Sequence, residues 1–547
     1  MPKSISFRRL PGGNALFFDY IDDFERTRDF FHFDYRQPLS EWKPLAEART
    51  HSFCDRGPLI AALLRDAERW GGSAQTLRNI EALRDPQTLA VVTGQQVGLF
   101  GGPLFTFYKA IATILWARAI QKSTGRRTVP VFWMETSDHD FFEVNHIRLL
   151  NLEGEEVLLS LTNPPEEKRR VVGSIVLNGE VEQLVQRLWT LLPPSSYRGQ
   201  KLELLSTCYH PGETLGGAFA KLYSYLFKED GLILYDAENK PSKKSLTPLL
   251  DHILSSGKDL NRLLHEATHA VNRAGYSPQI QPQEDRLQLF ARIGDVRVPI
   301  SSSGTLLHDG DPPEQLGIDN LRRKAAEHPE FFLPKVSLRP IFQDYLFPTV
   351  AYIAGPTEIA YFAQLKPLYD RLEVTMPAII PRLSATLIEG KVKKVLEKYQ
   401  FTPEQLRSGT SKLINQILES DSTYDLVGLF ARAREKWSEI RDNLLVGMMA
   451  IDPTLDHPVE KTLERWLMSL DVLEEKARAA MRRKNEMLVS QINKACMNLM
   501  PGGQLQERRF SLPYYMVRYG SALWQKIKSQ VKLDLYRHQL IYLEDES

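Results

Sequence analysis

Residues 94–102 contain four glycines, and a lysine follows at position 109. Glycine lets backbone N–H groups approach an anion closely, because no Cβ is in the way. A helix predicted to begin near Thr106 would add its positive end at the same place. The pattern matches neither GxxxxGK[ST] nor GxGxxG, so an anion-binding loop and a mere tight turn are equal alternatives. If the loop binds a nucleotide, the residues that hold it are Gly94, Gly98, Gly101, Gly102 and Lys109.

A cluster of acidic, imidazole and amide groups follows the apolar run at residues 129–134. In open α/β sheets, ligands bind outside the carboxyl ends of the strands. Such groups there could supply a general base and hold substrate hydroxyls. The predicted catalytic residues are Asp138, His139 and Asp140, and Asn145 is a predicted substrate-binding residue. The alternatives are a metal site formed by Asp138, His139 and His146, and a polar helix cap at the surface.

A third group surrounds an apolar run at residues 349–354. Arg339 precedes the run, and Glu358 follows it after a Gly-Pro turn. The planar fork of an arginine suits a carboxylate or a phosphate, but a structural ion pair is equally compatible with the pattern. Together with the two glutamines of the glycine-rich loop, this group gives the predicted substrate-binding residues Gln95, Gln96, Arg339, Gln343, Glu358 and Tyr361.

A fourth set joins two segments that are far apart in the sequence. Arg382 and Ser384 follow the apolar run at 376–381, and Gln506 and Arg508 follow a Pro-Gly-Gly sequence. Both segments lie where a predicted helical arm joins the core, so the two could meet. These four residues are predicted to bind a nucleotide, and salt bridges at a domain junction are the alternative.

The elements that must position these groups can be read from the periodicity. A short apolar run, a glycine-rich loop, a helix over residues 106–121 and a second apolar run form a βαβ unit, which is typical of parallel sheets. We therefore predict an α/β fold with a parallel-sheet core over residues 1–384. Insertions are expected at about 151–205, with β structure, and at 272–330, where Gly, Pro and Ser cluster. The predicted strands are 89–92, 129–134, 231–236, 349–355 and 376–381.

From residue 385 the pattern becomes helical. We predict a helical domain over residues 385–510 and a C-terminal segment, 511–547, that returns to the core. Apolar residues in one helix alternate at spacings of three and four, which is the heptad pattern of a coiled coil, either antiparallel or intermolecular. The alternative is an amphipathic helix packed on its own domain. The residues of this seam are Leu463, Trp466, Leu470, Leu473, Ala477 and Ala480.

Composition limits the classes of protein that are possible. The 547 residues suffice for two or three domains, and 69 basic against 68 acidic residues argue against a nucleic-acid coat. The three cysteines show no CxxC spacing, which excludes a disulfide framework and suits a reducing cytosol. No apolar stretch has the length of a signal peptide or a membrane span. We expect a soluble cytoplasmic protein whose partners are small molecules or a second copy, with no nucleic acid and no membrane.

Five long strings together resemble the family of cysteine-adding enzymes of bacillithiol synthesis. Their order, their spacing and the total length fit over essentially the whole chain. The strings are TGQQVGLFGGPLFTFYK (93–109), VFWMETSDHDFFEVNHI (131–147), LRPIFQDYLFPTVAYIAGPTEIAYFAQL (338–365), MPAIIPRLS (376–384) and QLQER (504–508). The resemblance implies a nucleotide-binding Rossmann-like core with two connecting insertions and a helical coiled-coil domain that forms a homodimer. It also implies a ligase that adds L-cysteine to glucosaminyl-malate, the last step of bacillithiol biosynthesis.

Joining a free carboxylate to an amine in water requires an activated carboxyl. We therefore expect ATP or another nucleotide with Mg²⁺ as cosubstrate, and we predict no metal-binding residues. The glycine-rich loop and Lys109 would hold phosphate or the activated carboxyl, and Arg339 or Arg382 the malate carboxylates. His139 or Asp138 would take the proton of the amine. The competing hypotheses are a non-catalytic partner protein that binds the nucleotide or the amino sugar, and a metal-dependent hydrolase built on Asp138, His139 and His146.

Overall fold

The computed structural model describes residues 3–49, 54–162, 170–308, 312–420, 425–533 and 537–543. The chain divides into two compact units, one formed mainly by residues 2–387 with 504–541 and the other mainly by residues 388–503. The chain re-enters the larger unit at residue 504, before the predicted return at 511. Gln506 and Arg508 therefore belong to the same unit as Arg382 and Ser384.

A five-stranded parallel sheet forms the centre of the larger unit, as predicted. Both of its faces are covered, so its strands are almost continuously apolar. In spatial order the strands are β13 (Ala378–Pro381), β12 (Thr349–Ala354), β2 (Leu89–Gln96), β3 (Thr128–Glu135) and β6 (Ile233–Asp236).

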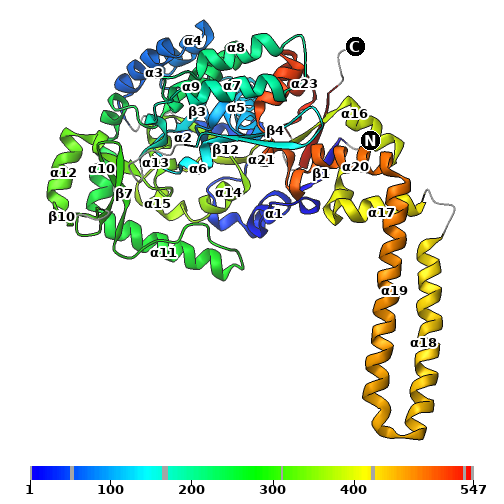
Figure 1. Ribbon diagram of the computed structural model, residues 1–547. Helices are drawn as coiled ribbons and strands as arrows, with labels where there is room; N and C mark the ends of the chain where they lie inside the picture. Colours follow the sequence, from blue (N-terminus) through cyan, green and yellow to red (C-terminus); the bar gives the residue numbers. More distant parts are fainter. Residues whose placement is uncertain are drawn as a thin grey trace. The chain divides into compact units, whose positions relative to one another are not determined.

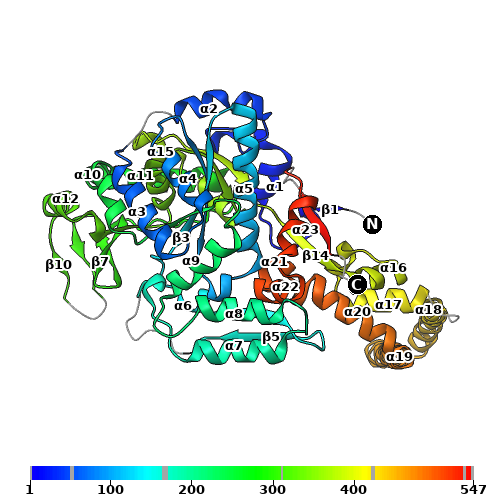
Figure 2. The ribbon, with the colours of Figure 1, turned by 90° about the horizontal axis from the view of Figure 1, so that it is seen from above.

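Helix α5 (Leu104–Thr124) connects β2 to β3 and packs on both strands (Figure 2). Apolar side chains lie on nearly all of its sides, because it is enclosed by the sheet and by other helices. The helix ends at Gly125, whose φ of 72° lets its N–H donate to the carbonyl of Gln121. The βαβ unit expected from the sequence is therefore present.

The order of the strands places a crevice at the carboxyl edge of the sheet. From β2 the chain passes to β3 on one side, whereas from β12 it passes to β13 on the other side. Ligands bind in the crevice at such a reversal of strand order. The residues that follow β2, β3, β12 and β13 therefore converge on one place.

The first inserted segment begins with a hairpin of β4 (His146–Leu150) and β5 (Glu156–Ser160). The hairpin is the β structure that was expected in this insertion, and helices α7 (Glu180–Leu191) and α8 (Arg198–Cys208) follow it. In α7 the buried residues recur at spacings of three and four, which is a helical period and not an alternating one. Residues 163–169 of this insertion lie outside the described part of the chain.

The second inserted segment forms an antiparallel sheet, which extends into the residues after it. Its strands, in spatial order, are β10 (Glu314–Gln315), β9 (Thr305–Leu306), β8 (Val296–Ser301), β7 (Arg286–Ile293) and β11 (Phe332–Pro334). Residues 309–311 of the predicted Gly- and Pro-rich cluster lie outside the described residues. This sheet matters for the site because β8 carries Arg297 and β11 carries Pro334 to the crevice.

The smaller unit is helical, and its two longest helices, α18 (Leu426–Ile451) and α19 (Asp456–Lys484), run antiparallel side by side (Figure 1). The rings of Trp437 and Trp466 contact each other at 4.9 Å, and Arg434 pairs with Asp471 at 2.8 Å. The predicted coiled coil thus exists as a pair of helices within one chain. Of the predicted seam, Leu463 is buried, whereas Leu473 is 56% exposed.

The start of β15 (Arg537–Leu543) pairs antiparallel with β1 (Ser4–Ser6) in the larger unit. This pairing brings His538, near the end of the chain, next to the residues that follow β13. Among the described residues, no helix has both the length and the apolar character needed to cross a membrane.

Candidate active site

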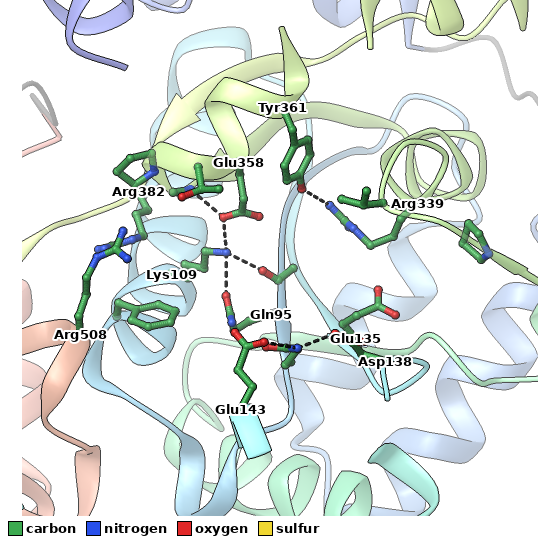
Figure 3. A pocket seen from close by; sticks show the side chains of 18 of the residues that line it. Gln95, Lys109, Glu135, Asp138, Glu143, Arg339, Glu358, Tyr361, Arg382 and Arg508 are labelled. Atoms are coloured by element: carbon green, nitrogen blue, oxygen red, sulfur yellow. Dashed lines mark hydrogen bonds and ion pairs between the residues drawn. The ribbon is translucent and has the colours of Figure 1, made fainter. Parts of the chain in front are cut away.

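A cavity of about 490 Å³ lies at the carboxyl edge of the sheet, at the reversal of strand order (Figure 3). Its polar and charged lining comes from the ends of β2, β3, β12 and β13, from α5 and α13 (Arg339–Leu346), and from the second inserted sheet. The residues that define its chemistry are Gly94, Gln95, Gln96, Lys109, Glu135, Asp138, Glu143, Arg297, Arg339, Glu358, Tyr361, Arg382 and Arg508.

Lys109 and Glu358 form a buried ion pair on one side of this cavity, with 2.5 Å between Nζ and Oε2. The ammonium of Lys109 also donates to the carbonyl of Gly94 at 2.7 Å and to Oε1 of Gln95 at 3.0 Å. Burial alone would raise the pKa of Glu358, but Lys109 and two further donors keep that pKa below its usual range. An ammonium has three N–H donors, and all three are used by the protein. Lys109 therefore ties the loop after β2 to Glu358.

The glycine-rich loop folds as a tight turn after β2. Gly101 and Gly102 have φ of 90° and 72°, values that favour glycine. Their N–H groups donate within the loop, to the carbonyls of Gly98 and Leu99. A Cβ on Gly98 would lie 2.7 Å from the Cα of Gly102. These contacts favour the tight-turn interpretation, and of the loop glycines only Gly94 lines the main cavity.

Asp138 lies on the opposite side of the cavity and is the only predicted catalytic residue in its wall. Its carboxylate accepts from Nη1 of Arg297 at 3.1 Å and from Nε2 of Gln96 at 2.5 Å. Burial opposes the charge, but the hydrogen bonds from His139, together with Arg297 and Gln96, hold the pKa of Asp138 well below its usual range. The residue therefore stays ionised and is a weak proton acceptor.

The other residues predicted from this cluster face away from the cavity or support it. His139 has an exposed side chain that contacts Asp138 at 3.2 Å. Asp140 accepts the N–H of Glu143 and caps α6 (Phe141–Val144), as the helix-cap alternative suggested. Asn145 is buried and donates to the carbonyl of Leu161 at 2.8 Å.

Glu135 and Glu143 line the cavity, although neither was among the predicted site residues. Oε2 of Glu135 accepts from the indole N–H of Trp133 at 3.0 Å, and Oε1 accepts from the hydroxyl of Ser137. Glu143 accepts from Gln96 at 3.0 Å. Burial raises the pKa of both carboxyl groups. Glu135 is the last residue of β3, so the rule that pointed to Asp138 applied equally to it.

Arg339 is buried, and its guanidinium faces the cavity. It donates to the hydroxyls of Tyr352 and Tyr361, each at 3.1 Å, and to Oε1 of Gln343 at 3.2 Å. Gln343 is fully buried behind the arginine and does not line the cavity, whereas Tyr361 does. Of the predicted substrate-binding residues in this group, Arg339, Glu358 and Tyr361 are thus accessible from the cavity.

The two distant segments of the fourth predicted set do meet. Arg382 pairs with Glu507 at 2.7 Å, with 5% and 0% of the two side chains exposed. Ser384 also donates to Glu507, and Gln506 exchanges hydrogen bonds with the backbone of Leu387. Ser384 and Gln506 therefore belong to the buried network that holds Arg382 in place. The salt bridge agrees with the structural alternative, although all of these residues lie within the larger unit.

Arg508 differs from Arg382 because its guanidinium makes no ion pair or hydrogen bond with a described residue; only its backbone N–H is bonded, to the carbonyl of Leu505. It lines the main cavity and also a neighbouring cavity of about 310 Å³. The second cavity is also lined by His146, Arg148 and Arg509, and a single carboxylate, Glu156, pairs with both of these arginines. Glu143 also lines this second cavity, but the three arginines outnumber it, and guanidinium groups suit phosphate or carboxylate oxygens.

Asp138, His139 and His146 do not form a metal site. Within the described part of the chain, no group of three or more His, Cys, Asp or Glu side chains is placed to hold a metal ion. His146 instead contacts the carbonyl of Phe142 at 3.1 Å. The geometry gives no support to the metal-dependent hydrolase considered above.

The fold and the site together define a class of protein. It is a Rossmann-like α/β protein with a helical coiled-coil unit, and its cavity is lined by both carboxylates and arginines (Figure 3). Such a cavity suits small molecules that carry both an amine and acidic groups.

Comparison with known proteins agrees with this class. Residues 3–383 match the family described as "Bacillithiol biosynthesis BshC, N-terminal Rossmann-like domain", and residues 385–543 match "Bacillithiol biosynthesis BshC, C-terminal coiled-coil domain". The chain belongs to the BshC family. The resemblance found in the sequence and the predicted fold class are thereby confirmed.

Relatives with the printed name "Putative cysteine ligase BshC" cover nearly the whole chain. The protein of Salinibacter ruber is 34% identical over 526 residues, which is 96% of both chains. The protein of Chlorobaculum tepidum is 31% identical over 94% of this chain and 93% of its own. That of Desulforamulus reducens is 29% identical over 96% of this chain and 97% of its own.

Proposed function

We propose that this protein is a cysteine ligase of bacillithiol biosynthesis, which joins the carboxyl group of L-cysteine to the amino group of glucosaminyl-malate. The observation that carries the proposal is that the cavity is lined by carboxylates, among them Glu135, Asp138 and Glu143, and by arginines, among them Arg382 and Arg508. The amine of the acceptor fits the carboxylates, and carboxylate or phosphate groups fit the arginines.

A nucleoside triphosphate with Mg²⁺ is the natural source of the activated carboxyl. Arg508 fits such a cosubstrate, because its guanidinium is unpaired among the described residues and lines both cavities. When bound, the nucleotide supplies a phosphate leaving group on the carboxyl of cysteine. The protein itself holds the two reactants in contact and stabilises the charge at phosphate.

The acceptor carries malate carboxylates as well as an amine. Arg339, with Tyr361 beside it, lines the same cavity and could bind one of them. Asp138 is a permanent anion held by Arg297, so it suits an ammonium or a sugar hydroxyl. Glu358 and Lys109 neutralise each other and serve to shape the wall.

Two further predictions accompany this function. A homodimer through the helical unit is compatible with the apolar residues that the α18–α19 pair leaves exposed, such as Val446, Ile451 and Val472. A cytoplasmic location is expected for a biosynthetic enzyme whose cysteines are all free.

The test is mass spectrometry of the purified protein incubated with L-cysteine, glucosaminyl-malate, Mg²⁺ and ATP or another nucleoside triphosphate. Phosphate and pyrophosphate are measured in the same samples. Formation of bacillithiol with pyrophosphate supports an acyl-adenylate, and formation with phosphate supports an acyl-phosphate. Binding of the amino sugar with no product under any nucleotide would contradict the proposal and would favour the non-catalytic partner protein.

A further inference from the structure

Four carboxylates line the main cavity, and two of them are held in ion pairs. Asp138 pairs with Arg297 at 3.1 Å, and Glu358 pairs with Lys109 at 2.5 Å. A carboxylate in an ion pair is stabilised in its charged form and accepts a proton poorly. Neither of the two residues is therefore suited to take a proton from a substrate.

Glu135 has the opposite surroundings. Both of its oxygens are held by neutral donors, the indole of Trp133 and the hydroxyl of Ser137, and it makes no ion pair with a described residue. Since a hydroxyl can accept as well as donate, Ser137 can keep its hydrogen bond after Glu135 is protonated. These hydrogen bonds thus fix the orientation of this carboxylate without an ion pair.

The neighbours of Glu135 also suit an incoming ammonium group. Asp138 stays ionised beside it, and Glu135 is the last residue of the buried strand β3, whereas Glu143 lies on an exposed helical turn. Burial raises the pKa of Glu135, and the charge of Asp138 acts in the same direction, whereas the charges of Arg339 and Arg297 and the hydrogen bond from Ser137 act against it without cancelling it. A raised pKa makes a carboxylate a better general base near neutral pH.

We propose that Glu135 is the general base of the ligation and that it accepts the proton of the acceptor's ammonium group, whereas Asp138 binds that group as a fixed anion. This inference rests on the proposed function. The Glu135 carboxylate takes one proton from the ammonium, and the freed nitrogen lone pair forms the C–N bond with the activated carboxyl carbon of cysteine. The C–O bond to the phosphate group then breaks, and this group leaves with the electron pair. The second proton of the nitrogen is lost to the departing phosphate as the amide forms.

The experiment compares two acceptors in the same reaction. Glucosaminyl-malate presents an amine that is largely protonated and needs a base, whereas hydroxylamine is unprotonated at neutral pH and needs none. L-cysteine, Mg²⁺ and the active nucleoside triphosphate are supplied to the wild type, to Glu135→Gln and to a matched control. The control is Glu182→Gln, an exposed position on α7 away from the cavity. Amide and hydroxamate are measured by mass spectrometry.

We expect Glu135→Gln to lower the rate of amide formation at least about 100-fold, as for the loss of a general base. Hydroxamate formation should stay close to the wild-type rate, because activation of cysteine does not use Glu135. Glu182→Gln should change neither rate. In the wild type, the ratio of amide to hydroxamate should fall as the pH is lowered through the pKa of Glu135. This pH dependence is measured on the wild type, so it tests the proposal even if the variant fails to fold.

Every other outcome of this experiment contradicts a specific part of the proposal. Equal loss of both products in a folded Glu135→Gln variant would show a structural or activating role. Wild-type rates in this variant, or a selective loss in Glu143→Gln, would exclude Glu135 as the base and leave the proposed ligation intact. Hydroxamate without amide in the wild type would show that the proposed acceptor is wrong, and the role of Glu135 would fall with it.

Discussion

Nζ of Lys109 lies 2.5 Å from Oε2 of Glu358, which joins helix α5 to helix α14 (Pro356–Phe362) at the crevice between β2 and β12. The lysine side chain is 2% exposed, and its remaining donors go to Gly94 and Gln95. The pair therefore connects the two halves of the sheet at the point where the strand order reverses. This arrangement gives Lys109 a structural role, although its spacing from the glycines first indicated a phosphate ligand.

Replacing Lys109 with Met should destabilise the larger unit by about 3 kcal/mol, because the largely buried charge of Glu358 loses its cation and keeps only the neutral donors Tyr352 and Gly355. Its thermal unfolding midpoint should fall accordingly. The double variant Lys109→Met/Glu358→Gln should recover part of this loss, since no unpaired charge remains. If the loss of stability in the double variant equals the sum of the losses in the two single variants, the two residues are not coupled.

Arg508→Met should leave stability almost unchanged and raise the KM of the nucleotide or of the acidic substrate about 10-fold or more. The reason is that Arg508 makes no ion pair with a described residue and faces both cavities. Arg382→Met is the matched comparison, because it leaves Glu507 buried without its partner. That variant should lose about 3–5 kcal/mol. An unfolded Arg508→Met protein, or an unchanged KM, would contradict this division of roles.

Gly98→Ala should destabilise the loop after β2 by about 1–3 kcal/mol, because the new Cβ would overlap the backbone of Gly102. Gly179→Ala is the control, since its Cβ would meet nothing within 4 Å and its φ is −61°. The control should change stability by no more than about 0.5 kcal/mol. The measurement is the thermal unfolding midpoint of both variants. Equal midpoints would mean that the loop accommodates the new Cβ without loss of stability.

His538 should make the larger unit less stable in mild acid. Burial lowers its pKa to about 4, whereas an unfolded histidine titrates near about 6.5. The unfolded state therefore binds more protons between these values, so the free energy of unfolding decreases as the pH falls from 6.5 towards 4. The contribution of this one residue amounts to about 3 kcal/mol.

The measurement is the unfolding midpoint as a function of pH for the wild type and for His538→Gln. The ring of His538 bonds to the hydroxyls of Ser384 and Thr386, and Glu507 and Arg382 are the charged groups that face it. The variant should lose most of the pH dependence above pH 4.5. His269→Gln, exposed on α11 (Gly257–Arg273), should retain it. The same slope in both variants would assign the acid sensitivity to other groups.

The sequence by itself determined the parallel sheet, the crossover helix, the helical arm and the edge at which the site lies. These features depend on local periodicity and on the rule that the carboxyl ends of parallel strands meet, both of which can be read along the chain. The strings around Gly94, Asp138, Arg339 and Arg382 were sufficient to indicate the family.

Only the tertiary structure decided which charges are free. Lys109, Asp138 and Arg382 look like ligands in the sequence, but each is paired with a residue from a distant segment. Arg297, which neutralises Asp138, comes from an inserted sheet that no local pattern links to the site. The ability of a side chain to bind a substrate or to accept a proton depends on its neighbours in space and on its burial, and long-range packing sets both.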